Sequence, residues 1–568
     1  MNNPSRTDDT LCHPGWNQNP PPLNADATTR QDLNGIANSR EQRDHALQPD
    51  TVGNISLRAE ETEIGSNALN SPMLLSTLEA EPPGKRSRFQ VLSGCILREL
   101  IKFSHFVGPG FLIAVAYIDP GNYATDVAAG AQSKYAMLFV VMLSNIFAVF
   151  LQSLCIKLGS VTGLNLAENC RIHLPRWMVI ILYILSEAAI IATDIAEVIG
   201  SAIALNLLFK IPLVAGCAIT LVDVLFLLIF YRPNGSMFGL RAFEMFVTAL
   251  VLGVVVCFCI QLSLIKSQSV GEVLRGYLPS ASVVRNGGSI YQSCGILGAT
   301  IMPHSLFLGS GIVQPRLKHF DVLQGYVDSA TAFQDDGKDP DYRPSIYAIR
   351  NCLKYSIIEL TLALFTFAVF VNSAILIVAG AALFGTDGAD NADLFGVHKL
   401  LSQSISPAAG TIFALALLLS GLSAGIICTI AGQMVSEGMI RWTLKPWLRR
   451  FITRAISIIP SIIIAGAVGE TGLNAALTAS QVVLSVILPF ATAPLIYFTC
   501  RNRYMTVQTV IRDGDGDGDG DGEGDATATI DVVKMRNSWP VTVLALMIWL
   551  AITTLNVALL VFLGLGQT

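Results

Sequence analysis

Eleven apolar segments, each close to the length of a bilayer-crossing helix, constrain this chain more than any other feature of its sequence. A helix needs about 20 residues to cross the hydrocarbon core of a membrane. Charged residues make up only 14% of the chain, against about 25% in a typical soluble domain. The sequence therefore predicts an all-α polytopic membrane protein. The spans are expected at 106–131, 136–158, 177–206, 212–231, 242–265, 291–313, 352–383, 409–433, 456–474, 478–499 and 540–563.

Two polar regions flank a membrane core at 100–500. Residues 1–95 show no apolar periodicity and no secretory signal, so a disordered N-terminal tail is expected. Residues 501–539 contain alternating Asp and Gly, but a calcium loop that begins at Asp513 would place Gly524 at position 12, where a Glu is needed. We expect an acidic cytosolic linker there, followed by the eleventh span within 540–568.

The eleven cysteines are scattered, with no C-x-x-C pair. They are expected to be small buried apolar residues, which excludes a disulfide scaffold and a zinc module. The net charge of −5 argues against a broad nucleic-acid surface.

The distribution of Lys and Arg predicts the orientation of the spans. If the N-terminus is cytosolic, 26 of these residues lie near the spans on the cytosolic side, and six lie in the opposite loops. Cytosolic loops carry the excess of positive charge. The sequence therefore predicts a cytosolic N-terminus and an external C-terminus.

The first and sixth spans are both interrupted by Gly and Pro. These two spans occupy equivalent places if two five-span units cross the membrane in opposite orientations. Paired interruptions of this kind indicate an inverted-repeat transporter with its binding site near the midplane. The eleventh span then lies outside the repeat.

Span 1 is interrupted at Asp119-Pro-Gly-Asn122. Proline lacks an amide donor and glycine is a poor helix former, so the helix should break here. A break at membrane depth survives only where its backbone lines a polar cavity. An unpaired carboxylate at Asp119 would cost at least ~2.5 kcal/mol, which a bound cation would offset. The alternative is a proline kink in which Asp119 caps the second half-helix.

Span 6 is interrupted in the same way at Met302-Pro-His304. Taken singly, Met302 would be lipid-facing filler and His304 a satisfied core residue. Their position beside a proline, in the span equivalent to span 1, favours a binding site. A thioether is a soft ligand that favours transition metals over Mg²⁺ or Ca²⁺. With carboxylate and amide oxygens it suits Mn²⁺, Fe²⁺ or Co²⁺.

Span 3 carries three acids, Glu187, Asp194 and Glu197, within an arc of about 80° on one helix face. Acids inside a membrane line polar pathways or pair with bases, because lipid would expel them. One interpretation is an ion-pair cluster that holds helices together. The other is a proton relay next to His304, since imidazole exchanges protons near neutral pH. Two further intramembrane acids are expected to be structural: Asp223 and Glu244.

Five stretches, in chain order, resemble the signatures of the NRAMP (natural resistance-associated macrophage protein) family of divalent metal transporters. They are Asp119–Asn122, Glu187–Gly200, Gly298–His304, Ala431–Gln433 and Ser480–Phe490. The resemblance covers about residues 100–500 and is strongest to fungal members. It implies a LeuT-like five-plus-five fold and proton-coupled symport of Mn²⁺ or Fe²⁺ toward the cytosol.

The resemblance also implies which residues bind the metal. They would be the side chains of Asp119, Asn122 and Met302, the carbonyl of Ala299, the carbonyl of Ala116 in another state, and Gln481 in the closed site.

The proton route implied by the resemblance starts at Asp119 and His304. It continues through the acids of span 3, with two basic partners: Glu197, Asp194, Glu187, Arg316 and Arg454. The chain departs from the family pattern at Ser305 and Gly309, where Asn and His are usual, and at Leu422 in span 8. These departures bear on proton coupling more than on metal binding.

Two alternatives remain open: a LeuT-like carrier of a small organic solute and a metal sensor that does not transport. A carrier of organic solutes would usually have small residues where Met302 stands. An enzyme is not expected, because the sequence has no nucleophile–base set and no HExxH motif. No cofactor is expected, and the partners are divalent metal ions, protons and membrane lipid, without nucleic acid. The plasma membrane and a vacuolar or endosomal membrane are both compatible locations.

Overall fold

The computed structural model describes residues 108–220, 237–265, 268–284, 287–327, 342–385, 393–442, 446–467, 469–512 and 528–566. All of them fall within the unit Phe103–Thr568. Three predictions lie outside the described residues: the N-terminal tail at 1–95, the acid Asp223 and the acidic tract at 513–525.

The apolar runs form helices, and eight in the described part of the chain are long and apolar enough to cross a membrane. Of span 4, predicted at 212–231, residues 212–220 are described, and they are helical from 213 on. The other helices of the first five-span unit are α3 (Pro109–Val115) and α4 (Pro120–Ser133), which together form span 1, α5 (Leu138–Thr162), α7 (Arg176–Phe209) and α9 (Met237–Leu264).

The second unit repeats this order. Its helices are α11 (Gly287–Thr300) and α12 (Pro303–Gly311) as span 6, α15 (Ile346–Ala363), the π-helical η2 (Leu364–Ala368) and α16 (Val369–Leu383) as span 7, α18 (Pro407–Ile440), α19 (Pro446–Ala467) and α20 (Gly469–Thr499). The eleventh span is α21 (Trp539–Gly564).

Short helices lie between the spans. They are α6 (Leu166–His173), α10 (Val270–Gly276), the 3-10 helix η1 (Ala281–Val284), α13 (Gln314–Leu323) and α17 (Leu394–Ser404). Helix α6 begins with a capping box, in which Asn165 and Glu168 each bond the other's backbone N–H.

Both predicted helix breaks are present, and each has the same local cause. Pro120 and Pro303 stand in the first turns of α4 and α12, where a missing N–H costs no helical bond. The residues before them, Asp119 and Met302, have extended backbones, with ψ of 165° and 131°. A residue before proline is pushed out of the helical region by the pyrrolidine ring. Sequence alone therefore determines where spans 1 and 6 are interrupted.

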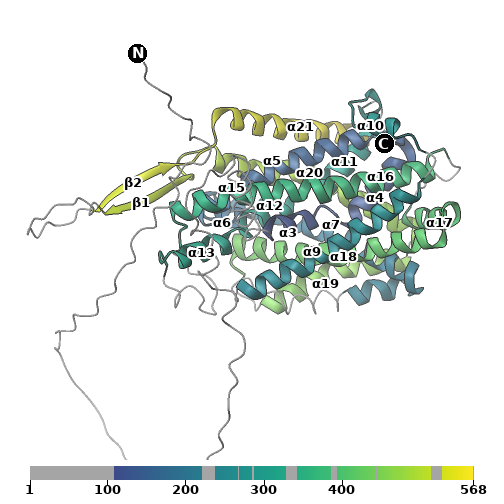
Figure 1. Ribbon diagram of the computed structural model, residues 1–568, viewed down its shortest axis with the longest axis horizontal. Coiled ribbons are helices and arrows are strands. Elements are labelled where there is room, and N and C mark those ends of the chain that lie inside the picture. The colour runs from purple at the N-terminus through teal and green to yellow at the C-terminus, as the bar shows by residue number, and fades with distance from the viewer. Residues whose placement is uncertain are drawn as a thin grey trace, which may run out of the picture. The chain divides into compact units, whose positions relative to one another are not determined.

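The half-helices of span 1 pack against different neighbours. Helix α3 packs against α15 and α9, whereas α4 packs against α16, α11 and α20. Helices α3 and α12 also touch each other, and α21 lies next to α20 and α5 (Figure 1). The two halves of span 1 therefore contact different helices for the most part, although both touch α18 and both pack on span 7.

Large buried side chains fill the core around span 1. Tyr123 lies between Phe258 of α9 and Phe413 of α18, with ring centroids 5.6 and 5.9 Å away. Such tilted aromatic pairs stabilise beyond the area they bury. Of the nine cysteines in the described part of the chain, seven are buried, in agreement with the prediction that they behave as apolar residues.

The predicted boundary between spans 9 and 10 is wrong. The polar stretch at 469–474, expected to end span 9, instead forms the first turns of α20. Helix α20 begins at Gly469, which has a φ of +71°. Glycine adopts this left-handed conformation without strain, so the polar stretch can be the start of a helix instead of a loop.

The region 501–539, predicted as a linker, contains two strands. Strands β1 (Thr506–Arg512) and β2 (Ala528–Lys534) pair antiparallel, from Thr506 opposite Lys534 to Arg512 opposite Ala528. At the base of this pair Met535 donates its N–H to the Met505 carbonyl. Both strands are rich in Val, Ile and Thr, which favour extended structure. The linker prediction rested on the Asp-Gly repeat between the strands and did not use this signal.

Candidate functional site

Each proline deprives one carbonyl of its helical partner. A helical carbonyl accepts from the N–H four residues later, and proline has none. The carbonyl four residues before Pro120 belongs to Ala116, and the one four residues before Pro303 belongs to Ala299. These are the two carbonyls predicted as metal ligands, and both residues are buried. Each break therefore leaves one carbonyl without its helical partner, and the carbonyl of Ala299 accepts from a side chain instead.

Side chains from other spans satisfy the remaining carbonyls of the first break. Tyr117 O accepts from Asn122 Nδ2 at 3.2 Å and from Asn372 Nδ2 of α16 at 3.1 Å. Ile118 O accepts from Ser420 Oγ of α18 at 2.6 Å. The break is therefore a polar site built by three spans, as a break at membrane depth requires.

Asp119 uses one carboxylate oxygen and leaves the other free. Its Oδ1 accepts from the Asn122 backbone N at 2.9 Å and from Asn122 Nδ2 at 2.6 Å. Its Oδ2 is buried and has no hydrogen-bond partner among the described residues. The capping role considered as an alternative is thus present, but it occupies only half of the carboxylate. A buried anionic oxygen without a partner is costly unless a cation or proton joins it.

Gln481 of α20 lies beside this free oxygen. A Cβ on Gly121 would stand 2.8 Å from Asp119 Oδ2 and would overlap the Gln481 amide. The Gln481 Nε2 donates to Ser480 Oγ at 3.0 Å, while its Oε1 has no partner among the described residues. The Gln481 amide nitrogen therefore occupies the space beside Gly121, close to the Asp119 oxygen that has no partner.

Asn122 joins the two breaks. Its Nδ2 donates to the Ala299 carbonyl at 3.0 Å, across from span 1 to span 6. Four of the predicted ligand residues thus form one connected group: Asp119, Asn122, Ala299 and Gln481. Met302 stands in the same break as Ala299, and its side chain packs in an apolar cluster with residues of α7 and α20, including Ala189 and Leu484.

His304 follows Pro303 on α12 and is buried. Its Nδ1 lies 3.4 Å from Thr193 Oγ1 on α7, directly before the acid Asp194. The structure therefore brings His304 to the helix that carries the predicted proton acids.

Gln152 of α5 lies against both positions at which the chain departs from the family pattern, Ser305 and Gly309. The Gln152 Nε2 donates to Ser305 Oγ at 2.9 Å and to Tyr117 Oη at 3.0 Å. Ser305 Oγ in turn donates to the Met302 carbonyl at 2.8 Å. A Cβ on Gly309 would overlap the Gln152 Oε1. One glutamine therefore fills the space that a side chain at 309 would need and links both breaks.

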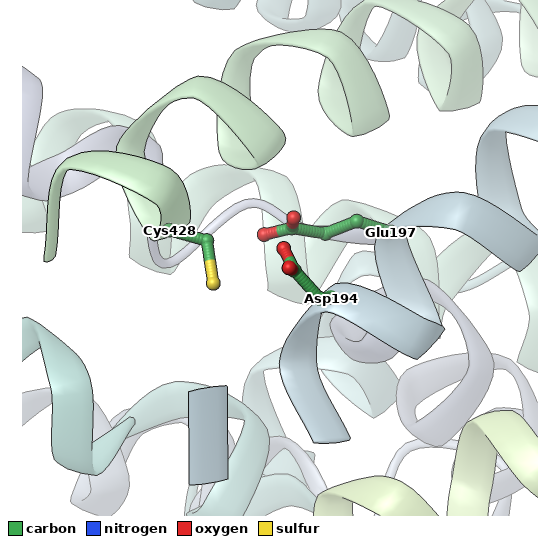
Figure 2. Close-up of side chains that lie close together, drawn as sticks. All are labelled: Asp194, Glu197 and Cys428. Carbon is green, nitrogen blue, oxygen red and sulfur yellow. The ribbon is translucent and has the colours of Figure 1, made fainter. Parts of the chain in front are cut away.

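Two of the three acids of span 3 form a buried cluster with Arg454. The Arg454 Nη1 contacts Asp194 Oδ1 and lies 3.3 Å from Glu197 Oε2, and Ser457 Oγ donates to Asp194 Oδ2 at 2.9 Å. Cys428 of α18 lies beside both acids (Figure 2), with the three possible ligand atoms within 4.8 Å of one another. The positive charge of the Arg454 guanidinium already faces both carboxylates. Two carboxylates that share one guanidinium are better suited to binding a proton than to binding a metal ion in addition.

Glu187 and Arg316 lie apart from this cluster. Glu187 is only partly buried, and its Oε1 has no partner among the described residues. Arg316 Nη2 lies 2.7 Å from Glu244 Oε2 of α9, and both side chains are buried. The pairing of Arg316 therefore differs from the prediction that groups it with the span 3 acids, because α13 carries it beyond the end of span 6. Glu244, expected to be merely structural, is its partner.

Sequence reasoning missed several polar residues of the site. Asp126 is buried on α4, and neither of its oxygens has a partner among the described residues. It lies in the same span as the break at Asp119, and an acid inside a membrane span was a usable signal. The other missed residues come from distant spans and carry no local signal: Gln152, Asn372 and Ser420.

Comparison with known proteins agrees with this geometry. The family model "Natural resistance-associated macrophage protein-like" matches residues 110–512. The chain is 52% identical to the manganese transporter pdt1 of Schizosaccharomyces pombe, covering 82% of this chain and 86% of that protein. It is 53% identical to the iron transporter SMF3 of Saccharomyces cerevisiae, covering 72% and 84%.

A solved structure shows the same fold. The crystal structure of the Eremococcus coleocola manganese transporter matches with a TM-score of 0.64 and 32% identity, covering 85% of this chain and 89% of that one. The predicted LeuT-like arrangement of two five-span units with discontinuous spans 1 and 6 is confirmed, as are the multi-pass membrane class and the absence of enzymatic character in the family. The chain therefore belongs to the Nramp family of divalent metal ion transporters.

Proposed function

We propose that this protein is a proton-coupled symporter that carries Mn²⁺ and Fe²⁺ across its membrane toward the cytosol. Relatives at 50–53% identity are named manganese and iron transporters. The observation that carries the proposal is the free Asp119 Oδ2, buried beside Gln481 at the junction of two proline-broken helices. The excess of Lys and Arg on one side supports a cytosolic N-terminus.

The metal ligands in this proposal are the side chains of Asp119, Asn122 and Met302 with the carbonyl of Ala299. Ala116 would contribute its free carbonyl in another state, and Gln481 would join when the site closes. The Asn122 amide, which now donates to the Ala299 carbonyl, would turn over so that its oxygen faces the metal. An oxygen-rich set with one thioether suits Mn²⁺ and Fe²⁺.

Protons would pass through the second group of residues. The His304 Nδ1 lies 3.4 Å from the hydroxyl of Thr193, the residue before Asp194 on α7. Asp194 and Glu197 share one guanidinium, that of Arg454, so the cluster can take up one proton without excess positive charge. Glu187 would extend the route along α7, and Arg316 would act at its end, beside Glu244.

Uptake of Mn²⁺ into proteoliposomes tests the proposal. An inward proton gradient should accelerate uptake by the wild-type protein, and a protonophore should remove the acceleration. Glu272→Gln is the control variant. Glu272 is an acid in an exposed ion pair with Lys134, far from both breaks in the sequence and not paired with their residues. Uptake that ignores the gradient would contradict proton coupling, and no uptake at all would contradict transport.

Replacing Met302 with alanine should change selectivity more than rate. The remaining oxygen ligands still bind Mn²⁺, but the soft ligand that disfavours Ca²⁺ and Mg²⁺ is lost. We expect competition by Ca²⁺ against Mn²⁺ uptake to strengthen by about tenfold, equivalent to about 1.4 kcal/mol. Met439→Ala, another buried methionine on α18, is the control. Unchanged competition by Ca²⁺ would count against sulfur ligation.

A further inference from the structure

Four basic side chains, which we call the basic patch, lie around the end of α20. Arg501 and Arg503 follow α20 directly, His173 is the last residue of α6, and Arg343 precedes α15. All four are exposed, and none forms an ion pair with an acid among the described residues. The arginines of the patch therefore carry positive charge that no carboxylate of the described residues balances.

Two aromatic rings hold two of these arginines in place. The Arg501 guanidinium lies 4.4 Å from the centre of the Tyr497 ring, and that of Arg503 lies 5.8 Å from the centre of the Tyr504 ring. The two rings are neighbours, with centroids 5.6 Å apart and hydroxyls 3.3 Å apart. A guanidinium over a ring face is attracted by the ring quadrupole, and its N–H donors remain available to an anion. The arginines are therefore ordered before a ligand binds, which lowers the entropy cost of binding.

His173 and Arg343 complete the patch from two other segments. The His173 ring lies 4.7 Å from the Tyr504 ring. Partial burial lowers the pKa of His173, and the nearby charges of Arg503 and Arg343 lower it further. Arg343 is fixed by its hydrogen bond to the Thr162 carbonyl at the end of α5. The fold thus holds basic groups close together although they repel one another, and an anion bound among them would relieve that repulsion.

The patch lies where membrane helices leave the bilayer. Helix α20 ends at Thr499, just before Arg501, and α21 begins at Trp539. The two ends are joined, because Asn537 donates its N–H to the Thr499 carbonyl at 3.0 Å. The Trp539 side chain is 78% exposed, and exposed Trp and Tyr at the ends of spans are typical of the membrane–water interface. The patch is therefore at the depth of lipid head groups.

We propose that the basic patch binds the head group of an anionic phospholipid that carries several phosphate groups. Guanidinium groups bind phosphate oxygens through paired N–H donors. Three arginines exceed what the single phosphate of an ordinary phospholipid can balance, which favours an inositol head group with additional phosphates. Under the predicted orientation the patch faces the cytosol, where the leaflet contains anionic lipid. The inference goes beyond the proposed transport and uses it only for this orientation.

Titration of the detergent-solubilised full-length protein with short-chain lipids, followed by native mass spectrometry, tests the site. Dioctanoyl phosphatidylinositol bisphosphate should bind the wild type, and dioctanoyl phosphatidylcholine should not. The double variant Arg501→Gln with Arg503→Gln should weaken binding by at least about tenfold, because charge-assisted hydrogen bonds to phosphate are lost. Arg501→Lys with Arg503→Lys should lie between, since lysine keeps the charge but not the planar group over the ring.

The control is the double variant Arg350→Gln with Lys354→Gln, which removes the same charge from two exposed positions of α15. Among the described residues, the cations over the Tyr497 and Tyr504 rings are Arg501 and Arg503, not these two. The control should bind the lipid as the wild type does. Equal weakening in both glutamine variants would overturn the site, because it would indicate general surface charge. Wild-type affinity in Arg501→Gln with Arg503→Gln would overturn it as well.

Free inositol trisphosphate distinguishes a lipid from a soluble anion. It should bind at least about tenfold more weakly than the lipid, since it lacks the acyl chains that bury apolar surface. Equal affinity would overturn the lipid as the ligand. If the double variant does not purify as a folded protein, Arg501→Gln alone replaces it under the same criteria. Binding is measured without transport, so a failure of proton-driven Mn²⁺ uptake would leave this result unaffected.

Discussion

Asp119→Asn should reduce Mn²⁺ uptake by at least about a hundredfold at subsaturating metal, without unfolding the protein. The variant removes the negative charge whose Oδ2 has no partner among the described residues. Loss of a charged ligand of about 3 kcal/mol corresponds to about a hundredfold in affinity. Asparagine remains a good helix N-cap, so the bond to the Asn122 backbone N–H can persist. The measurement is the initial rate of Mn²⁺ uptake into proteoliposomes.

Two checks make this result specific. Thermal unfolding of metal-free Asp119→Asn should occur at a temperature no lower than that of the wild type, which would show that α4 keeps its cap. Glu272→Gln, which removes an acid from an exposed pair, should retain full uptake. Near-normal Mn²⁺ uptake by Asp119→Asn would remove the central ligand of the proposed site. That result would contradict the predicted set of metal ligands.

Arg454→Ala should destabilise the protein by about 3–5 kcal/mol, the usual cost of leaving buried charges without their partner. The guanidinium contacts Asp194 and Glu197, and all three side chains are buried. Without it, the two carboxylates of span 3 lie close together without the cation that span 9 supplies. Proton-driven uptake should fall as well. Without the guanidinium, the two buried carboxyls are favoured in their neutral, protonated form, so they no longer exchange a proton readily. Equilibrium or thermal unfolding in detergent measures the first effect.

A second substitution separates charge from packing. In the double variant Arg454→Ala with Asp194→Asn, most of the lost stability should return, since only one buried carboxylate remains. Arg454→Lys should lie between wild type and Arg454→Ala, because lysine keeps the charge but cannot contact both acids with one planar group. A double variant as unstable as Arg454→Ala would show that the loss came from packing. The charge cluster would then have no role in stability.

The position of both helix breaks could be predicted from the sequence because their cause is local. Proline has no N–H and restricts the residue before it, so Asp119 and Met302 are extended wherever the helices pack. The same reasoning identifies Ala116 and Ala299 as carbonyls without helical partners. The spans follow from the length of apolar runs in the same way.

Local patterns misled where a stronger signal lay nearby. The polar stretch at 469–474 indicated the separation of spans 9 and 10, yet it forms the start of α20, with Gly469 in a left-handed conformation. The Asp-Gly repeat at 513–525 indicated a linker, and the two strands that flank it in the sequence were not predicted.

The sequence by itself determined that this chain crosses the membrane many times, breaks at Pro120 and Pro303, and places Asp119 at a break. Only the tertiary structure decided which side chains complete those breaks: Asn372, Ser420 and Gln152 from spans 7, 8 and 2. It also paired Arg316 with Glu244 and brought Glu359 to α3. A backbone break is caused by residues next to it in the chain, whereas a hydrogen bond between spans depends on how helices hundreds of residues apart pack and rotate.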